Sequence, residues 1–286
     1  MSPPTLASPS PENVAATTAK RSDLPARAAA GLVLMALALA AVWAGFYWFT
    51  LFWLIAAIMV NSEWQNLIGG EGRAYRMAVG GLALAVAAFL AVDGRTMLAI
   101  LALGAGAGLS ALGADWRRPW ASGGMLYAGA MLVAICALRM SEPHGARAVL
   151  WLFALVWGAD IMAYFGGRRI GGPKLWPRIS PGKTWSGFAI GIVCGAALGA
   201  GFAPTPANAP ALFAFGLAVA AVSQAGDLFE SAIKRHFGVK DSSRLIPGHG
   251  GVMDRLDGFI AAAVFAAAVG LIRGGAGQVA EGVLQW

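Results

Sequence analysis

Long apolar runs alternate with short polar segments along almost the whole chain. Most of these runs approach the length of about 20 residues that a helix needs to cross the hydrocarbon core of a bilayer. The pattern therefore predicts an all-α, polytopic integral membrane protein. Hydropathy places nine spans at roughly residues 28–45, 47–61, 77–92, 95–113, 123–140, 148–165, 187–204, 210–232 and 258–273.

Composition supports a membrane protein over a water-soluble one. Of the 286 residues, 58% are hydrophobic and 12% are charged, whereas an ordinary soluble domain has about 25% charged residues. The 1–26 segment, rich in Ser, Pro, Thr and Ala, cannot bury enough apolar surface to fold alone, so we expect a disordered tail. The glycines at 104, 106 and 108 are expected to let neighbouring helices approach closely.

The distribution of positive charge predicts the orientation. If the N-terminus is cytoplasmic, all but four of the 21 lysines and arginines fall in inside segments, the exceptions being Arg95, Arg139, Arg147 and Arg273. This is the asymmetry that the positive-inside rule expects of nine spans. We interpret the net charge of +7 as a topology signal that also meets anionic lipid, and we expect no nucleic acid partner.

Polar residues are concentrated in the second half of the chain. Two long inside segments, 166–186 and 233–257, combine basic residues with glycine and proline. We therefore expect residues 146–286 to form the catalytic region. Residues 27–145 have short loops and few polar residues within their spans, and we expect a transmembrane scaffold there.

Two carboxylates stand within predicted spans, Asp160 in the sixth and Asp227 in the eighth. An ionised aspartate at mid-membrane costs about 2.5–3.5 kcal/mol on insertion scales, so it normally faces a cavity and has a partner. A functional role is favoured over a structural pairing with a nearby basic residue. Asp227, Ser231 and Lys234 follow one another at intervals of four and three, which predicts one shared helix face.

The polar segment after the eighth span suits a polyphosphate with a metal ion. Basic groups neutralise phosphate, glycines let backbone N–H groups approach oxyanions, and carboxylates three residues apart near a helix start can share a face. Hard carboxylate oxygens favour Mg²⁺. His249 is a general base or a turn residue, and we favour the turn. The candidates are Lys234, Arg235, Lys240, Asp241, Gly248, His249, Gly250, Gly251, Asp254, Arg255 and Asp257.

The other inside segment contains Gly182-Lys183-Thr184, which is similar to the end of a Walker A phosphate-binding loop. Pro177 occupies the position of the opening glycine, and we expect no strand before the motif, so a loop of that type is excluded. Lys183 either binds phosphate as a point charge or serves only as a topology signal.

Three stretches between about residues 150 and 260 resemble the phosphatidate cytidylyltransferase family. The chain departs from the family at Gly182, where a basic residue is usual, and at Ser186, where Glu is usual. The matching stretches are Asp160-x-x-Ala163-Tyr164-x-x-Gly167, Leu175-x-Pro177-x-Ile179-Ser180-Pro181-x-Lys183-Thr184-Trp185 and Ser231-x-x-Lys234-Arg235-x-x-x-x-Lys240-Asp241-x-x-x-x-x-Pro247-Gly248-His249-Gly250-Gly251-x-x-Asp254-Arg255-x-Asp257.

This resemblance implies an integral membrane enzyme of phospholipid biosynthesis that converts CTP and phosphatidate to CDP-diacylglycerol and pyrophosphate. It implies Mg²⁺ dependence, a homodimer, and a site on the cytoplasmic face of a bacterial inner membrane. Asp227 and Asp254 are the positions that it assigns to the metal. Together with the polar pattern, it makes Lys234, Arg235, Lys240, Asp241, Arg255 and Asp257 catalytic candidates and Asp160, Lys183, Ser231, Gly248, His249, Gly250 and Gly251 substrate-binding candidates.

Two other functions remain open. One is another CTP-using enzyme of membrane lipids: a polyprenol kinase would release CDP, whereas a cytidylyltransferase for a different lipid would release pyrophosphate. An ion-coupled transporter would use Asp160 and Asp227 as a cation relay. Transporter sites usually lie near mid-membrane between related repeats, whereas the polar residues here gather at one face of one half. The transporter is therefore the weaker alternative.

Overall fold

The computed structural model describes residues 29–243, 245 and 250–286. The disordered tail expected at 1–26 lies outside these residues. So do Gly248 and His249, which were predicted to bind substrate.

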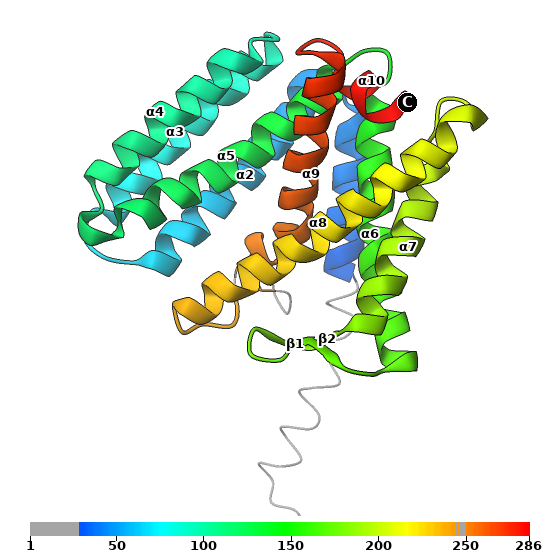
Figure 1. Ribbon diagram of the computed structural model, residues 1–286. Coiled ribbons are helices and arrows are strands. Elements are labelled where there is room, and N and C mark those ends of the chain that lie inside the picture. The colour runs from blue at the N-terminus through cyan, green and yellow to red at the C-terminus, as the bar shows by residue number, and fades with distance from the viewer. Residues whose placement is uncertain (1–28, 244, 246–249) are drawn as a thin grey trace, which may run out of the picture.

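The described residues form a bundle of apolar helices with one short hairpin (Figure 1). The all-α prediction holds for everything except that hairpin and a few connections. After a first helix at Ala29–Trp43, the helices are α2 (Phe46–Ile68), α3 (Arg73–Val92), α4 (Thr96–Leu112), α5 (Arg118–Met140), α6 (Gly145–Ile170), α7 (Trp185–Ala200), α8 (Ala209–His236), α9 (Met253–Gly274) and α10 (Val279–Leu284); the strands are β1 (Lys174–Trp176) and β2 (Ser180–Thr184), and 3₁₀ turns stand at Asp115–Arg117 and Pro206–Asn208.

Each predicted span coincides with a helix, but the helices differ in length. Six are long and apolar enough to cross a membrane: α2, α3, α5, α6, α8 and α9, with α5 and α8 counted together with the 3₁₀ turns before them. The Ala29–Trp43 helix, α4 and α7 are apolar but shorter. The count of nine membrane crossings stays a prediction.

Helices α6 and α8 continue beyond the apolar runs that predicted them. The last turn of α6 contains Arg168 and Arg169, and that of α8 contains Lys234, Arg235 and His236. Positive side chains near the C-terminus of a helix interact favourably with its dipole, so these turns stay helical after the apolar run has ended. Hydropathy registers only the apolar part, and the polar ends of both helices fall in segments that were predicted to be loops.

The connections predicted to lie on the inside gather at one end of the bundle. The α2–α3 and α4–α5 connections, the β1–β2 hairpin and the α8–α9 connection all stand at the lower ends of their helices in Figure 1. The described parts of the polar segments 166–186 and 233–257 are therefore at one end of the bundle (Figure 1). The side of the membrane to which this end belongs remains a prediction.

One basic residue of this end serves the fold itself. Arg76 is fully buried, although it was counted as a topology charge. Its guanidinium donates hydrogen bonds of 2.6–2.8 Å to the Gln65 side chain and to the carbonyls of Gly69, Glu71 and Gly113. It thereby fastens the α2–α3 connection to the end of α4.

Helix α7 packs on α6 through a row of glycines, which decides where the hairpin between them lies. Gly187, Gly191 and Gly195 face carbonyl oxygens of α6, and a Cβ atom at any of the three would lie 2.7 Å from one of these oxygens. At the start of α7 the Thr184 hydroxyl caps the helix by accepting a 3.1 Å hydrogen bond from Gly187 N. The close packing and the cap hold the end of β2 against α6.

The glycines of α4 follow the prediction only in part. A Cβ atom on Gly106 would collide with Ala83 and Met125, so this glycine permits close packing. Gly104 and Gly108 have open space at the same position, and their assignment to helix packing is wrong. Residues two apart on a helix point to different sides, so alternate glycines cannot all face one neighbour.

Helix α9 stands in the middle of the bundle, where aromatic rings anchor it. Trp53 of α2 stacks on Phe259 of α9 with ring centroids 5.0 Å apart, and Phe153 of α6 lies 5.6 Å from the same ring. Such pairs contribute about 0.5–1.5 kcal/mol each beyond the area that they bury. They fix the height of α9, and with it the position of its polar first turn.

Candidate active site

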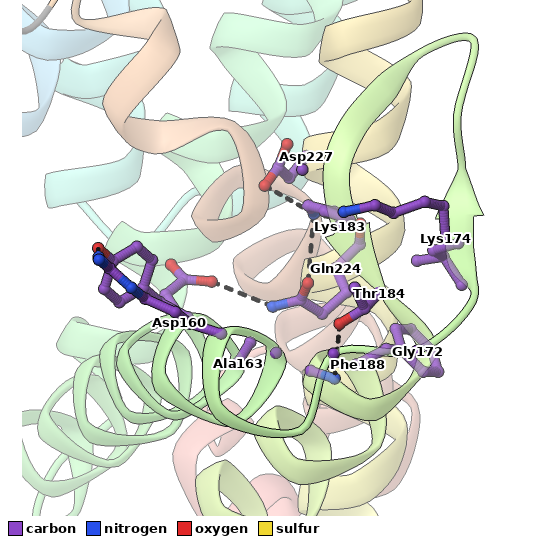
Figure 2. A pocket seen from close by; sticks show the side chains of 16 residues that line it. Asp160, Ala163, Gly172, Lys174, Lys183, Thr184, Phe188, Gln224 and Asp227 are labelled. Atoms are coloured by element: carbon purple, nitrogen blue, oxygen red, sulfur yellow. Dashed lines mark hydrogen bonds and ion pairs between the residues drawn. The ribbon is translucent and has the colours of Figure 1, made fainter.

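A cavity of about 720 Å³ opens between α6, the hairpin, α7 and α8. We call it the hairpin pocket (Figure 2). Its wall combines carboxylates, basic side chains and glycines, and its residues come from α6, from the hairpin with the start of α7, and from α8. The lining residues are Asp160, Ala163, Tyr164, Gly167, Arg168, Gly171, Gly172, Lys174, Leu175, Gly182, Lys183, Thr184, Gly187, Phe188, Gln224 and Asp227.

A chain of polar contacts crosses the hairpin pocket (Figure 2). Lys183 Nζ lies 2.7 Å from Asp227 Oδ2 and donates a 3.2 Å hydrogen bond to Gln224 Oε1. The Gln224 amide in turn donates to Asp160 Oδ1 at 3.2 Å. Ser231 Oγ donates to Asp227 Oδ1 at 3.4 Å, which confirms that this serine and aspartate share a helix face. Two acids predicted from separate spans are thus joined through one lysine and one amide.

The hairpin supplies the lysine of this chain. Strands β1 and β2 pair antiparallel, with Lys174 opposite Thr184 and Trp176 opposite Ser180. A strand therefore precedes Gly182-Lys183-Thr184, and the expectation of none is wrong. Strands of three and five residues that bury little surface leave no hydropathy signal. The substitution of Pro177 for the opening glycine still separates this motif from a Walker A loop.

A second group of charged residues lies where α8 meets the start of α9. Lys234 Nζ is 2.7 Å from Asp254 Oδ1 and 2.6 Å from Glu230 Oε2. Asp254 also accepts hydrogen bonds from Gly251 N at 2.7 Å and from the backbone and hydroxyl of Ser242 at 3.0 and 2.9 Å. We call these five residues the loop cluster. Lys234 was predicted to share the face of Asp227, but its ammonium is used here.

The loop cluster is sealed from solvent. Glu230 is completely buried, and Lys234 and Asp254 are each 8% exposed. Although Glu230 Oε2 is close to the ammonium, neither of its oxygens has a partner aligned for a hydrogen bond among residues 29–243, 245 and 250–286. The lysine is therefore shared between two carboxylates, and Asp254 is the better satisfied of the two.

Two residues of the first half reach this end of the molecule. Glu63 of α2 accepts hydrogen bonds from Val252 N at 2.9 Å and Met253 N at 2.7 Å. Tyr127 of α5 donates to the backbone carbonyl of Asp257 at 3.4 Å. Sequence reasoning missed both residues, together with Gln224 and Glu230. Like Asp160, Glu63 is an acid next to apolar residues, and such acids are functional candidates. Glu63 was not considered because the predicted second span ended two residues before it.

The remaining acid, Asp257, stands in the first turns of α9 and is not among the residues that line the hairpin pocket. Its charge interacts with those of Asp227 and Asp160 in the pocket and with that of Glu230 in the loop cluster, so it stands between the two groups. Asp254 and Asp257 follow each other by one helical turn but serve different surroundings.

The donor set fits Mg²⁺ in kind, because it consists of carboxylate oxygens. Among the described residues, no three acidic, histidine or cysteine side chains converge as a complete metal cage. A magnesium ion does not require one, since it usually binds one or two carboxylates and takes its other ligands from water and nucleotide phosphate. The predicted metal positions Asp227 and Asp254 pair with separate lysines, Lys183 and Lys234. Their assignment to the metal stays a prediction.

The glycines before α9 are required by packing. Gly250 has a φ of +82°, and a Cβ atom there would lie 2.6 Å from Asp254 Oδ2. A Cβ atom on Gly251 would lie 2.6 Å from both carboxylate oxygens of Glu63. The backbone at these glycines approaches anionic oxygens, as predicted. The oxygens belong to the carboxylates of Asp254 and Glu63.

The other predicted catalytic residues are exposed on the same end of the bundle. None of them forms a side-chain ion pair within the described part of the chain. Arg235 donates a 3.1 Å hydrogen bond to the carbonyl of Val239. The three basic side chains among them remain available to anions from solution. The exposed residues are Arg235, Lys240, Asp241 and Arg255.

Comparison with known proteins agrees with this arrangement. Residues 25–272 match the model of the family described as "Cytidylyltransferase family". The chain is 42% identical over 250 residues to the phosphatidate cytidylyltransferase of Brucella abortus, which covers 85% of this chain and 91% of that protein. It is also similar to the enzymes of the same name from Haemophilus influenzae, with 45% identity over 129 residues, 43% of this chain and 45% of that protein, and from Bacillus subtilis, with 40% over 138 residues, 47% and 51%.

The family model spans all three segments that build the hairpin pocket, and the Brucella relative aligns over nearly its whole length. With its apolar helices and its polar pocket at one end of them, this chain belongs to the cytidylyltransferase family and is a nucleotidyltransferase enzyme of the membrane.

Proposed function

We propose that this protein transfers the cytidylyl group of CTP to phosphatidate, producing CDP-diacylglycerol and pyrophosphate for phospholipid biosynthesis. The observation that carries the proposal is the Lys183–Asp227 pair, which stands in an open polar pocket at the end of membrane-length helices. The relatives named above bear this activity in their names.

The reaction needs little covalent chemistry from the protein. A phosphate oxygen of phosphatidate attacks the α-phosphorus of CTP, a new P–O bond forms, and the bond to the bridging oxygen of the β-phosphate breaks to release pyrophosphate. The attacking phosphate is already an anion, so no strong base is required. The task of the enzyme is to bring two anions together in line and to stabilise the added charge.

The basic side chains of the hairpin pocket perform that task. Lys183, Lys174 and Arg168 line it from the hairpin and from the end of α6. They reduce the repulsion between the triphosphate and the lipid phosphate, and the pocket wall orients both. The exposed cations Arg235, Lys240 and Arg255 would draw anions to the same end of the molecule.

Magnesium is the implied cofactor. Asp227 and Asp254 would hold it, with Asp257 and Asp160 nearby, and the ion would offset the charge of the triphosphate when bound. Each of the two ligand carboxylates now pairs with a lysine.

The position of the pocket suits one soluble and one lipid substrate. It lies where α6 and α8 pass from apolar to basic residues, so CTP can reach it from water while the acyl chains of phosphatidate stay among the helices. By the positive-inside rule we assign this end to the cytoplasmic face of a bacterial inner membrane. The proposal includes a homodimer and no nucleic acid partner.

Product analysis tests the proposal. Purified protein in detergent would be incubated with labelled CTP, phosphatidate and Mg²⁺, and again after chelation of the metal. We expect equal amounts of pyrophosphate and CDP-diacylglycerol, and their loss without Mg²⁺. Release of CDP would show a lipid kinase instead. Ion flux in vesicles without CTP consumption would show a transporter.

A further inference from the structure

Glu63 of α2 holds the segment that carries Asp254, although nearly the whole of the described chain separates the two in sequence. Its carboxylate is 4% exposed and accepts four hydrogen bonds from residues 242–253. The donors are Ser243 Oγ at 2.7 Å, Met253 N at 2.7 Å, Val252 N at 2.9 Å and Ser242 Oγ at 3.2 Å.

These contacts define the start of α9. The first backbone N–H groups of a helix have no partner within the helix, and those of Val252 and Met253 find theirs on Glu63. A negative charge at this end also interacts favourably with the helix dipole. Asp254 is the next residue, so the carboxylate of α2 fixes the backbone from which Asp254 projects.

The fit depends on a carboxylate. Oε1 receives Val252 N and Ser243 Oγ, while Oε2 receives Met253 N and Ser242 Oγ, so each oxygen accepts one N–H and one hydroxyl. An amide nitrogen cannot accept a hydrogen bond. With glutamine, either orientation would leave one backbone N–H without a partner in a buried place, while the hydroxyls could turn elsewhere.

The same loop is closed around Glu63 from the other side. Gly251 lies against both of its oxygens, and the single hydroxyl proton of Ser242 is shared between Asp254 Oδ2 at 2.9 Å and Glu63 Oε2 at 3.2 Å. The loop cluster and Glu63 thus share one serine. A displacement of the loop from Glu63 would pull Ser242 and Gly251 away from Asp254.

We infer that Glu63 is a positioning residue for nucleotidyl transfer: by capping α9 from the scaffold half, it sets the placement of Asp254 relative to the hairpin pocket. The inference rests on the proposed function, because that reaction is its readout. Glu63 touches no residue of the hairpin pocket among the contacts above. Its loss should therefore lower kcat while CTP still binds between the hairpin and α6.

The test compares Glu63→Gln and Glu63→Asp with Glu71→Gln, a control at an exposed acid in the α2–α3 connection. We expect Glu63→Gln to lower kcat by at least about tenfold, with a much smaller change in the KM for CTP. Amide hydrogen exchange should accelerate at residues 242–254 and stay unchanged in α6 and α7. Glu63→Asp retains two acceptor oxygens and should recover part of both losses, whereas Glu71→Gln should match the wild type.

Two results would overturn the inference. One is a Glu63→Gln enzyme with the kcat and the loop exchange of the wild type. The other is faster exchange throughout the bundle, which would make Glu63 a general support of the fold. If the wild-type protein consumes no CTP, the proposed function fails by itself; the exchange data then still show whether Glu63 holds the loop.

Discussion

The hairpin pocket and the loop cluster both pair an aspartate of the second half with a lysine, but only one of the two pairs is open. The side chains of Lys183 and Asp227 are 19% and 29% exposed, whereas those of Lys234 and Asp254 are 11% and 4% exposed. Water and ligands can compete for the first pair. The second is enclosed by a buried glutamate and by backbone donors, so the same two residue types form an open pair in one place and an enclosed pair in the other.

The loop cluster should show the largest effect when it is broken. Lys234→Met would leave Asp254 and Glu230 buried without a cation, and loss of one partner of a buried pair costs about 3–5 kcal/mol. We expect a loss of stability of this size in denaturant unfolding of the detergent-solubilised protein. Arg147→Met is the control, since this exposed arginine at the start of α6 forms no ion pair within the described residues. If the Lys234 and Arg147 variants were equally stable, the Lys234–Asp254 pair would contribute nothing to the fold, and the contrast with the Lys183–Asp227 pair would be wrong.

A substitution in the hairpin pocket should lower the reaction rate more than it lowers the stability of the protein. Lys183→Met removes a cation aimed at the developing charge, which we expect to lower kcat/KM about 10²–10³-fold. Because water reaches Asp227, the free energy of unfolding should fall clearly less than in the Lys234 variant. Steady-state assays and unfolding of the same preparations decide the matter. A Lys183 variant that is unstable but normally active when folded would reverse the two roles.

A smaller effect is expected from the amide that joins the acids. Gln224→Leu would separate Lys183 from Asp160 and leave the Asp160 carboxylate without its amide donor. Hydrogen bonds to charged groups contribute about 1.5–3 kcal/mol, so kcat/KM should fall by at least about tenfold. The preceding residue offers a control, because the Ser223 hydroxyl is buried without a hydrogen-bond partner. Ser223→Ala should leave the rate unchanged, and an equal loss in both variants would contradict the polar chain.

The smallest effect concerns the cap that ends the hairpin. Thr184→Ala removes the acceptor for Gly187 N and should cost about 1 kcal/mol of stability. Thr184→Ser keeps the hydroxyl and should behave as the wild type. Thermal unfolding of the three proteins measures the difference. If the alanine variant were as stable as the serine variant, the start of α7 would depend on the glycine contacts alone.

Sequence reasoning identified the residues that are energetically unfavourable in their own stretch of sequence. Asp160 and Asp227 were identified because an acid in an apolar run needs a reason, and Lys183 because it stands in a polar motif. The apolar helices were predicted for the same reason, since their lengths follow from the hydropathy of the chain. The structure brings Asp160, Lys183 and Asp227 together in the hairpin pocket.

Sequence reasoning could not supply the partners. Lys234 has acids at several reachable positions, and only the packing of α8 on α9 selects Glu230 and Asp254. Glu63 acts on residues about 180 positions away, and no local pattern encodes such a contact. The hairpin was not predicted because its strands are too short and too exposed to show an alternation of polar and apolar residues.

The length of α7 has a consequence for the lipid around it. Its 16 residues span about 24 Å, less than the roughly 30 Å of an average hydrocarbon layer. Where this helix lies in a bilayer, the layer must thin beside it or the water boundary must dip to meet the hairpin. In a bilayer that this helix crosses, such a shortfall would bring lipid headgroups and dissolved nucleotides to a similar depth beside the hairpin pocket, and so shorten the distance between the two substrates.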